Sequence, residues 1–250
     1  QDKSMTFLRF QRILGCGFVT LSLWALPFSL YAETVDKRVL IPAGEYSLGS
    51  YYCEEEQNNA DWCNDEMPRK VTLNAFSIDK YEVTNVDYRE CFLAGVCEPE
   101  VLHDDRPEDF NKPHQPVVFV NWKDAETYCS WRDGKLPSEA QWEAAAQGQK
   151  LGGAHYQQLY ATGSPKEVGK LDANSNGLYD MMGNVYEWSR DDFSSVKAGE
   201  EMPSSKDEDK VVKGGSWNSP SHYLRISDRV KKDPVLRYSD VGFRCIQVEQ

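Results

Sequence analysis

Hydrophobic and polar residues alternate only over short stretches of this chain, and no long internal repeat is present. Residues 39–44 and 46–49 predict a short β-hairpin, and residues 69–78 alternate well enough to predict a strand. The apolar run at 117–120 predicts a further, buried strand. After Gly148 the pattern breaks up and Gly, Asn and Ser become frequent, which predicts irregular structure held by turns, disulfides and ions.

Three stretches carry the start signals of helices. Thr84 can cap a helix, with Asp87 at the positive end of its dipole. Residues 121–131 have helical spacing, and Ser138 with Gln141 three positions later has the spacing of a capping box. Helices combined with short strands and long loops predict an α+β fold, and aromatic residues, at 12% of the chain, can fill a core between such loops.

The beginning of the chain has the pattern of a secretory signal peptide. From Met5 onward, a basic start without acidic residues leads into an apolar run at 13–30, and the small residue Ala32 follows two positions later. We predict a signal peptide over residues 1–32, including a short leading segment, with cleavage favoured by Pro27 and Ala32. The alternative is an uncleaved membrane anchor, since the run nearly reaches the length that spans a bilayer. A lipoprotein signal at Cys16 is disfavoured because too few residues precede that cysteine.

The remaining domain, residues 33–250, is strongly acidic. The whole chain has 28 basic and 40 acidic residues, and residues 1–32 hold three of the basic residues and one of the acidic ones. The domain therefore keeps 25 basic and 39 acidic residues, a net charge of −14. Such a surface does not bind a phosphate backbone, so nucleic acid is excluded as a partner. Cationic ligands and divalent metals suit it better, although the charge also serves solubility alone.

An even number of cysteines behind a signal peptide predicts disulfides and an oxidising compartment, either periplasmic or extracellular. The six cysteines are Cys53, Cys63, Cys91, Cys97, Cys129 and Cys245. Sequence alone permits several pairings. Short spacing favours pairing the first with the second and the third with the fourth, which leaves the last two for each other. The spacings do not match those of zinc-binding motifs.

Several segments, in this order and spacing, resemble the formylglycine-generating enzyme family, also called the sulfatase-modifying factor domain. They lie at residues 41–50, 79–85, 118–143, 177–188, 213–217 and 241–245. The resemblance covers about residues 39–247, which is nearly the whole mature chain. It implies a C-type-lectin-like α+β fold that is poor in regular secondary structure and stabilised by disulfides. It also implies a Cys129–Cys245 disulfide, because the family has cysteines at both positions.

The oxidases of this family use two cysteines, five residues apart, to bind copper(I) and convert a substrate cysteine to formylglycine. The matching positions in this chain are Ser219 and Leu224. Soft thiolate ligands select copper(I), and neither a hydroxyl nor a hydrocarbon replaces them. We therefore expect neither copper binding nor formylglycine-generating activity. Whether the chain has another enzymatic activity stays open, although the loss of the pair argues against one.

A calcium site is predicted in the segment 180–187. The family resemblance assigns its ligands to the side chains of Asp180 and Glu187 and the carbonyl groups of Gly183 and Val185. A hard cation that takes six to eight oxygen ligands suits two carboxylates and two carbonyls in one short loop. The alternative is a salt-bridged turn without a metal.

A recognition pocket is the last prediction, and its lining is expected to be Trp122, Trp217, Asn218, Ser219, His222, Arg225, Asp240 and Arg244. Aromatic, amide and guanidinium groups that converge on a cleft suit specific binding. A serine-hydrolase triad of Ser219 or Ser221 with His222 and Asp228 is disfavoured, since a polar loop explains these residues equally well.

Three functions remain. The first is a non-catalytic binding or accessory module that holds a peptide, a glycan or an envelope protein. The second is a family enzyme with altered chemistry, either an oxidoreductase or a peptide- or protein-modifying enzyme. The third is a structural component of an envelope complex. In each case we expect the mature protein to be periplasmic or secreted, with no membrane span after signal cleavage.

Overall fold

The computed structural model describes residues 37–50, 53, 63, 65–99, 101–193 and 209–248, which belong to one compact unit spanning Val35–Gln250. The predicted signal peptide lies outside the described residues. Helices and strands follow in the order β1 (Arg38–Ile41), β2 (Gly44–Leu48), β3 (Arg69–Leu73), β4 (Phe76–Asp79), α2 (Asn85–Leu93), α3 (Pro107–Phe110), α4 (Trp122–Trp131), α5 (Glu139–Ala146), η2 (Leu151–Gly153), β5 (Tyr186–Asp192), β6 (Lys210–Lys213), η3 (Ser221–Tyr223), β7 (Val230–Lys232), β8 (Val241–Gly242) and β9 (Ile246–Val248).

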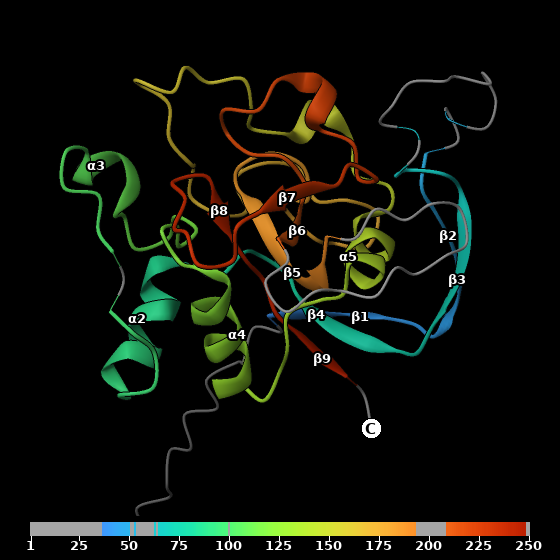
Figure 1. Ribbon diagram of the computed structural model, residues 1–250, viewed down its shortest axis with the longest axis horizontal. Helices are drawn as coiled ribbons and strands as arrows, with labels where there is room; N and C mark the ends of the chain where they lie inside the picture. Colours follow the sequence, from blue (N-terminus) through green and yellow to red (C-terminus); the bar gives the residue numbers. More distant parts are fainter. Residues whose placement is uncertain are drawn as a thin grey trace, which may run out of the picture. The chain divides into compact units, whose positions relative to one another are not determined.

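A four-stranded sheet in the order β7-β6-β5-β8 lies at the centre of this unit (Figure 1). Strand β5 pairs antiparallel with β6 and parallel with β8, and its register with β6 shifts between Trp188 and Asp192. A second sheet has the order β1-β4-β9, and β2 and β3 form a separate antiparallel pair. The α+β class predicted from the sequence is confirmed.

The three predicted helix starts are confirmed, because each has a complete capping box. Thr84 caps α2 together with Asp87, and Asn121 caps α4 together with Asp124. Ser138 and Gln141 do the same for α5. A capping box satisfies two free N–H groups with neighbouring side chains, so it depends on local sequence alone. In Figure 1, α2 and α4 lie next to each other beside the central strands, and α5 packs against β5, β6 and β2.

The strand predictions were less accurate. The hairpin predicted over 39–49 is wrong, because β1 pairs with β4 whereas β2 pairs with β3. Ile41 of β1 lies opposite Phe76 of β4, and both are buried in a core cluster that also contains Ile246. Burial of these apolar side chains outweighs the short local connection to β2.

Two further segments differ from their predicted structure. The strand predicted at 69–78 is interrupted, so that β3 and β4 belong to different sheets. Val117, Val118 and Val120 are buried and Phe119 is partly buried, but these residues do not form a strand, because Phe119 has a left-handed backbone with φ of 55°. A β-branched or bulky residue is uncommon in that region, so the surrounding structure must hold it there.

The prediction of irregular structure after Gly148 missed the central sheet. Strand β5 buries four consecutive residues, 186–189, on both of its faces. A strand that is buried on both faces has no alternation of polar and apolar residues, so its sequence lacks the usual strand signal.

The largest core cluster lies between α2, α4 and the central sheet. Tyr88 stacks on Tyr128 with ring centroids 5.8 Å apart, and Phe243 packs edge-on against Tyr128. The Cys129–Cys245 disulfide is buried in the same cluster. The pairs Cys53–Cys63 and Cys91–Cys97 are also formed, so all three predicted disulfides are confirmed. Within the described residues, no helix has the length and apolar character needed to cross a membrane.

Candidate functional site

The segment that the family resemblance matches to the copper site is a loop that follows β6. Gly214 and Gly215 open this loop with φ values of 93° and 76°, a backbone region that favours glycine. A Cβ atom on Gly215 would lie 2.3 Å from Cδ2 of Leu224, so the absence of a side chain lets the loop fold back on itself. Leu224 is consequently buried, and so is Ser219.

Ser219 belongs to a group of hydrogen-bonded side chains that we call the hydroxyl cluster, made up of Tyr186, Ser216, Asn218, Ser219 and Asp240. The Oγ atom of Ser216 lies 2.7 Å from Oδ1 of Asn218, 3.1 Å from Oγ of Ser219 and 3.4 Å from Oδ2 of Asp240. Ser219 in turn donates to the Tyr186 hydroxyl at 3.2 Å. The structure thus brings together three of the predicted pocket residues, together with two that the sequence did not indicate.

The side-chain hydrogen-bond partners of Ser219 are the hydroxyl groups of Ser216 and Tyr186, and neither is an adjacent base. Burial raises the pKa of Tyr186 to about 12, so its hydroxyl is neutral at ordinary pH. Burial also raises the pKa of Asp240, although Lys232 at 3.9 Å opposes this effect. His222 is exposed and packs on the ring of Tyr223, with the ring centroids 4.3 Å apart. Nucleophilic catalysis by serine requires an adjacent, oriented base, so this arrangement does not support the triad hypothesis.

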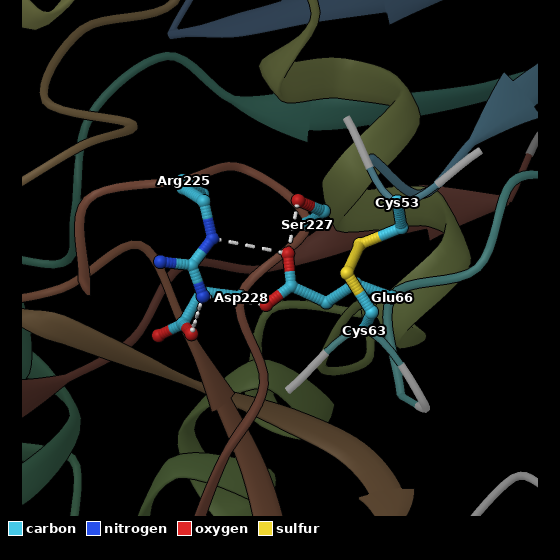
Figure 2. The surroundings of a disulfide bond; sticks show 6 residues. All are labelled: Cys53, Cys63, Glu66, Arg225, Ser227 and Asp228. Carbon is cyan, nitrogen blue, oxygen red and sulfur yellow. Dashed lines mark hydrogen bonds and ion pairs between the residues drawn. A yellow bond between two sulfur atoms is a disulfide. The ribbon is translucent and has the colours of Figure 1, made fainter. Parts of the chain in front are cut away.

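Arg225 forms a network of ion pairs with two buried carboxylates. Figure 2 shows its guanidinium group between Glu66 and Asp228, close to the Cys53–Cys63 disulfide. Its Nη2 atom lies 2.6 Å from Oε1 of Glu66 and 2.7 Å from Oδ1 of Asp228. The Glu66 side chain is 2% exposed and also accepts a hydrogen bond from Ser227. These contacts attach the loop to the segment that follows Cys63. Burial raises the pKa of Asp228 to about 6.

The two predicted tryptophans also lie apart from the hydroxyl cluster. Trp122 donates from Nε1 to the carbonyl group of Ser189, and the ammonium group of Lys210 lies 4.3 Å from its ring centroid. The ring of Trp217 packs against the rings of Phe110 and Tyr160. The eight predicted residues therefore do not form a single pocket.

Arg244 corrects the pocket prediction most clearly, because its side chain is fully buried. Nε and Nη2 of Arg244 donate to the two carboxylate oxygens of Glu187, each at 2.7 Å. Its guanidinium group also donates to the carbonyl groups of Asp79, Lys80 and Tyr179. Burial alone would lower the pKa of Arg244, but Glu187 raises it above its ordinary value. Arg244 thus stays charged inside the protein and does not reach a surface cleft.

Two further carboxylates accompany this ion pair, and we call Glu82, Asp180, Glu187 and Arg244 the buried acidic cluster. Asn184 donates to Oε1 of Glu82 at 2.9 Å, and a side-chain hydrogen bond also connects Glu82 to Asp180. Burial raises the pKa of Glu82 well above its usual range, and the charge of Asp180 adds to the effect. Burial likewise raises the pKa of Asp180. Three carboxylates therefore share one guanidinium group.

The buried acidic cluster contains both carboxylates of the predicted calcium site. Asp180 has φ of 59° and accepts a hydrogen bond from the backbone N–H of Gly169 at 2.7 Å. Glu187 accepts from Trp142 in addition to Arg244, so most of its lone pairs are already used. In the described part of the chain, no group of three or more His, Cys, Asp or Glu side chains is arranged as a metal site. A cation would therefore depend on few carboxylates together with backbone carbonyls.

Sequence analysis missed Glu82 in this cluster and Glu66 beside Arg225. Glu82 precedes its neighbour Asp180 by almost a hundred residues, and Glu66 lies far from Arg225 in the chain. No spacing rule connects residues so far apart. The only sequence signal was the position of Glu82 within the segment 79–85, which carries the family resemblance, and Glu66 had no such signal.

Comparison with known proteins gives the same fold. Treponema denticola variable protein 1 superposes with a TM-score of 0.67 and 23% identity, covering 85% of this chain and 95% of that chain. PvdO from Pseudomonas aeruginosa has the same TM-score at 24% identity, covering 85% of this chain and 94% of that chain. At these identities the likeness concerns the fold alone.

Sequence relatives include proteins with different names and lengths. Serine/threonine-protein kinase Pkn1 of Chlamydia trachomatis serovar L2 is 33% identical over 83% of this chain, but the match spans only 37% of the kinase. The inactive C-alpha-formylglycine-generating enzyme 2 of Mus musculus is 28% identical over 83% of this chain and 84% of its own length. The formylglycine-generating enzyme of Bos taurus is 27% identical over 84% of this chain and 74% of its own length.

The family model described as the sulfatase-modifying factor enzyme 1-like domain matches residues 25–248. That match includes the loop with Gly214 and Gly215, the hydroxyl cluster and the buried acidic cluster. This chain therefore belongs to the sulfatase-modifying factor enzyme 1-like domain family.

Proposed function

We propose that this chain is a recognition or accessory module and not a formylglycine-generating oxidase. The observation that carries the proposal is the replacement of both copper-binding thiols by the buried side chains of Ser219 and Leu224. All six cysteines beyond residue 36 are paired in disulfides, so none of them supplies a thiolate. A relative of similar length also bears the name of an inactive enzyme, which agrees with this proposal.

We also propose that the module acts in the periplasm or outside the cell. Three disulfides in one domain are typical of proteins that fold in an oxidising compartment. The pattern of residues 1–32 supplies the export signal in this proposal. The acidic surface keeps such a protein soluble without binding nucleic acid.

Copper(I) and a cysteine-containing peptide provide the test of the non-oxidase proposal. The purified chain is expected neither to bind copper(I) stoichiometrically nor to convert the peptide cysteine to an aldehyde, because soft sulfur ligands are missing. The double variant Ser219→Cys, Leu224→Cys restores two thiols at these positions and is expected to gain copper(I) binding. Copper titration and mass spectrometry of the peptide measure both effects. Aldehyde formation by the unmodified chain would contradict the proposal.

Calcium in the buried acidic cluster is a second proposal, and it concerns structure. Three carboxylic acid groups share one guanidinium group, so a divalent cation would favour their ionised form. The side chain of Asp180 would hold the ion together with the carbonyl groups of Gly183 and Val185 and the remaining lone pair of Glu187. The buried carboxyl group of Glu82 fits as a further hard ligand or as an acceptor for a water molecule bound to the ion. The bound ion would stabilise the turn at 180–187.

Removal of calcium is therefore expected to destabilise the protein. A ligand present at about a hundred times its Kd stabilises a fold by about 2.7 kcal/mol, so EDTA should lower the Tm by roughly 5–10 °C. Thermal unfolding with EDTA, and after return of excess calcium, measures the effect. Asp180→Ala should abolish the response, whereas Asp180→Asn, which keeps a ligand oxygen, should retain most of it. If calcium-loaded protein melts at the same temperature with EDTA, the calcium proposal is wrong.

A further inference from the structure

Trp217 lines a cavity whose lining includes no member of the hydroxyl cluster. The cavity has a volume of about 270 Å³, and its other lining residues are His103, Asp105, Arg106, Phe110, Tyr160, Ala161 and Ser239. We call it the aromatic cavity. None of these residues belongs to the lost copper site, and only Trp217 was predicted from sequence to bind anything. The cavity is therefore separate from the hydroxyl cluster.

Stacked rings form the walls of the aromatic cavity. His103 stacks on Phe110 with ring centroids 4.6 Å apart, and Tyr160 stacks on Trp217 at 5.9 Å. Trp217 is fully buried, but Tyr160 is 69% exposed. Tyr160 therefore presents a large aromatic surface to solvent, and the stacking contact with Trp217 holds its ring in place.

Hydrogen bonds from Arg106 make the cavity rigid. Its guanidinium group donates to the carbonyl groups of Tyr160 and Gly163 and to the carboxylate of Asp109. It also lies over the ring of Phe110, at 5.1 Å from the centroid. These contacts attach the loop that carries Tyr160 to the helix α3. A preformed site loses little conformational entropy when a ligand binds.

The backbone of Phe119 gives a second, independent indication of a functional site. Its φ of 55° is strained for a bulky residue, and the conformation places its ring against His103 and Phe110. Strain of this kind is concentrated at binding and catalytic sites, because the surrounding structure must maintain it.

The surface around the aromatic cavity combines apolar and acidic side chains. Val101, Leu102 and Leu159, which neighbour the lining residues in sequence, are 47%, 51% and 76% exposed. Asp104 and Asp105 are exposed in the same loop. Arg106, by contrast, uses its guanidinium group for contacts inside the protein. The rim is therefore apolar with a negative charge.

We propose that the aromatic cavity binds a polypeptide segment of a partner protein, which inserts one aromatic side chain and places a lysine or arginine beside Asp105. This proposal rests on the recognition function proposed above and names its site and the class of its partner. The cavity volume suits a single aromatic ring, and Tyr, Trp and Arg are the residues most enriched at the energetic centres of protein interfaces. The acidic rim supplies electrostatic complementarity to the basic neighbour.

An apolar rim distinguishes this site from one for a glycan. The exposed aliphatic side chains Val101, Leu102 and Leu159 offer no hydrogen bonds to sugar hydroxyl groups. Exposed apolar residues grouped on a soluble domain instead mark a protein interface. An aromatic side chain buries more apolar surface against them than a sugar ring would.

Selection of random peptides against the full chain tests this proposal. Phage-displayed peptides are enriched on the immobilised protein, and the selected sequences are synthesised with a fluorescent label for measurement of Kd by polarisation. We expect an aromatic residue next to Lys or Arg in the enriched sequences. Tyr160→Ala should weaken their binding by about tenfold or more, because it removes the exposed wall of the cavity. Asp105→Asn should weaken it mainly at low salt.

The matched control is Tyr223→Ala, which removes another exposed tyrosine, in this case beside the hydroxyl cluster. It should change the Kd by less than about twofold, a difference too small for a lost anchor contact. The proposal would be overturned if the Tyr160→Ala variant bound the selected peptides as tightly as the unmodified chain. It would also be overturned if the selection enriched acidic peptides or no peptides, or if the chain bound glycans on an array and Tyr160→Ala abolished that binding. Peptide binding that depends on Tyr223 would refute the proposal that the aromatic cavity is the binding site, while the proposed recognition function would stand. Oxidation of a thiol substrate by the chain would refute the proposed recognition function, independently of the peptide measurements.

Discussion

Arg244→Met is expected to lower the free energy of unfolding by about 3–5 kcal/mol. The guanidinium group of Arg244 is fully buried and pairs with both carboxylate oxygens of Glu187. Its removal leaves three buried carboxylates without their cation, and an unpaired buried charge has a large desolvation cost. Urea denaturation followed by circular dichroism measures the change, with calcium held constant.

Arg190→Met is the matched control for this substitution. The side chain of Arg190 is 44% exposed and lies 3.9 Å from Asp191, so its loss should change the free energy of unfolding by less than about 1 kcal/mol. The double variant Arg244→Met, Glu187→Gln should recover part of the loss, because it removes the uncompensated charge along with its partner. Equal effects of Arg244→Met and Arg190→Met would show that the buried ion pair does not stabilise the fold.

Replacing both Cys129 and Cys245 with alanine is expected to lower the free energy of unfolding by about 5 kcal/mol. The two residues are separated by 116 positions, and in the chain-entropy model the stabilisation increases with the logarithm of the loop length. The disulfide connects α4 to the segment between β8 and β9, inside the largest core cluster. Its loss should therefore lower the Tm and loosen the end of the chain, which hydrogen exchange can detect.

The Cys91–Cys97 disulfide provides the comparison, since it encloses a loop with a separation of only 6. The same model predicts a loss of about 2 kcal/mol when both of its cysteines become alanine. Both disulfides have buried sulfur atoms, so the cost of the smaller side chains is similar in the two double variants. If the two variants lose equal stability in urea denaturation, loop entropy is not the cause of the stabilisation.

Local signals predicted the helices of this protein better than its strands. Thr84, Asn121 and Ser138 each satisfy backbone N–H groups within three residues, so their effect is readable without the fold. Strand β5 gave no such signal, because burial on both faces removes the alternation on which strand prediction depends. The pairing of β1 with β4 was also missed, since it connects segments more than thirty residues apart.

The candidate sites divide in the same way. Ser219 and Leu224 were identified from sequence, because a missing sulfur atom is visible in the residue itself. The roles of Arg225 and Arg244 were not identified from sequence, because both guanidinium groups form ion pairs with buried carboxylates from other parts of the chain. A buried charge pairs with the opposite charge that the fold places beside it, because an unpaired buried charge has a large desolvation cost.

By itself, the sequence determined the helix starts and the short disulfides from residue identity and spacing over a few positions. The order of short segments along the chain determined the family, and the residues matched to its copper ligands are Ser219 and Leu224. Only the tertiary structure decided that Glu82 lies beside Asp180, that Arg244 neutralises Glu187, and that Tyr160 and Trp217 stack beside a cavity. These arrangements depend on contacts between distant segments, whose energies arise from burial and pairing in the folded chain and leave no periodic trace in the sequence.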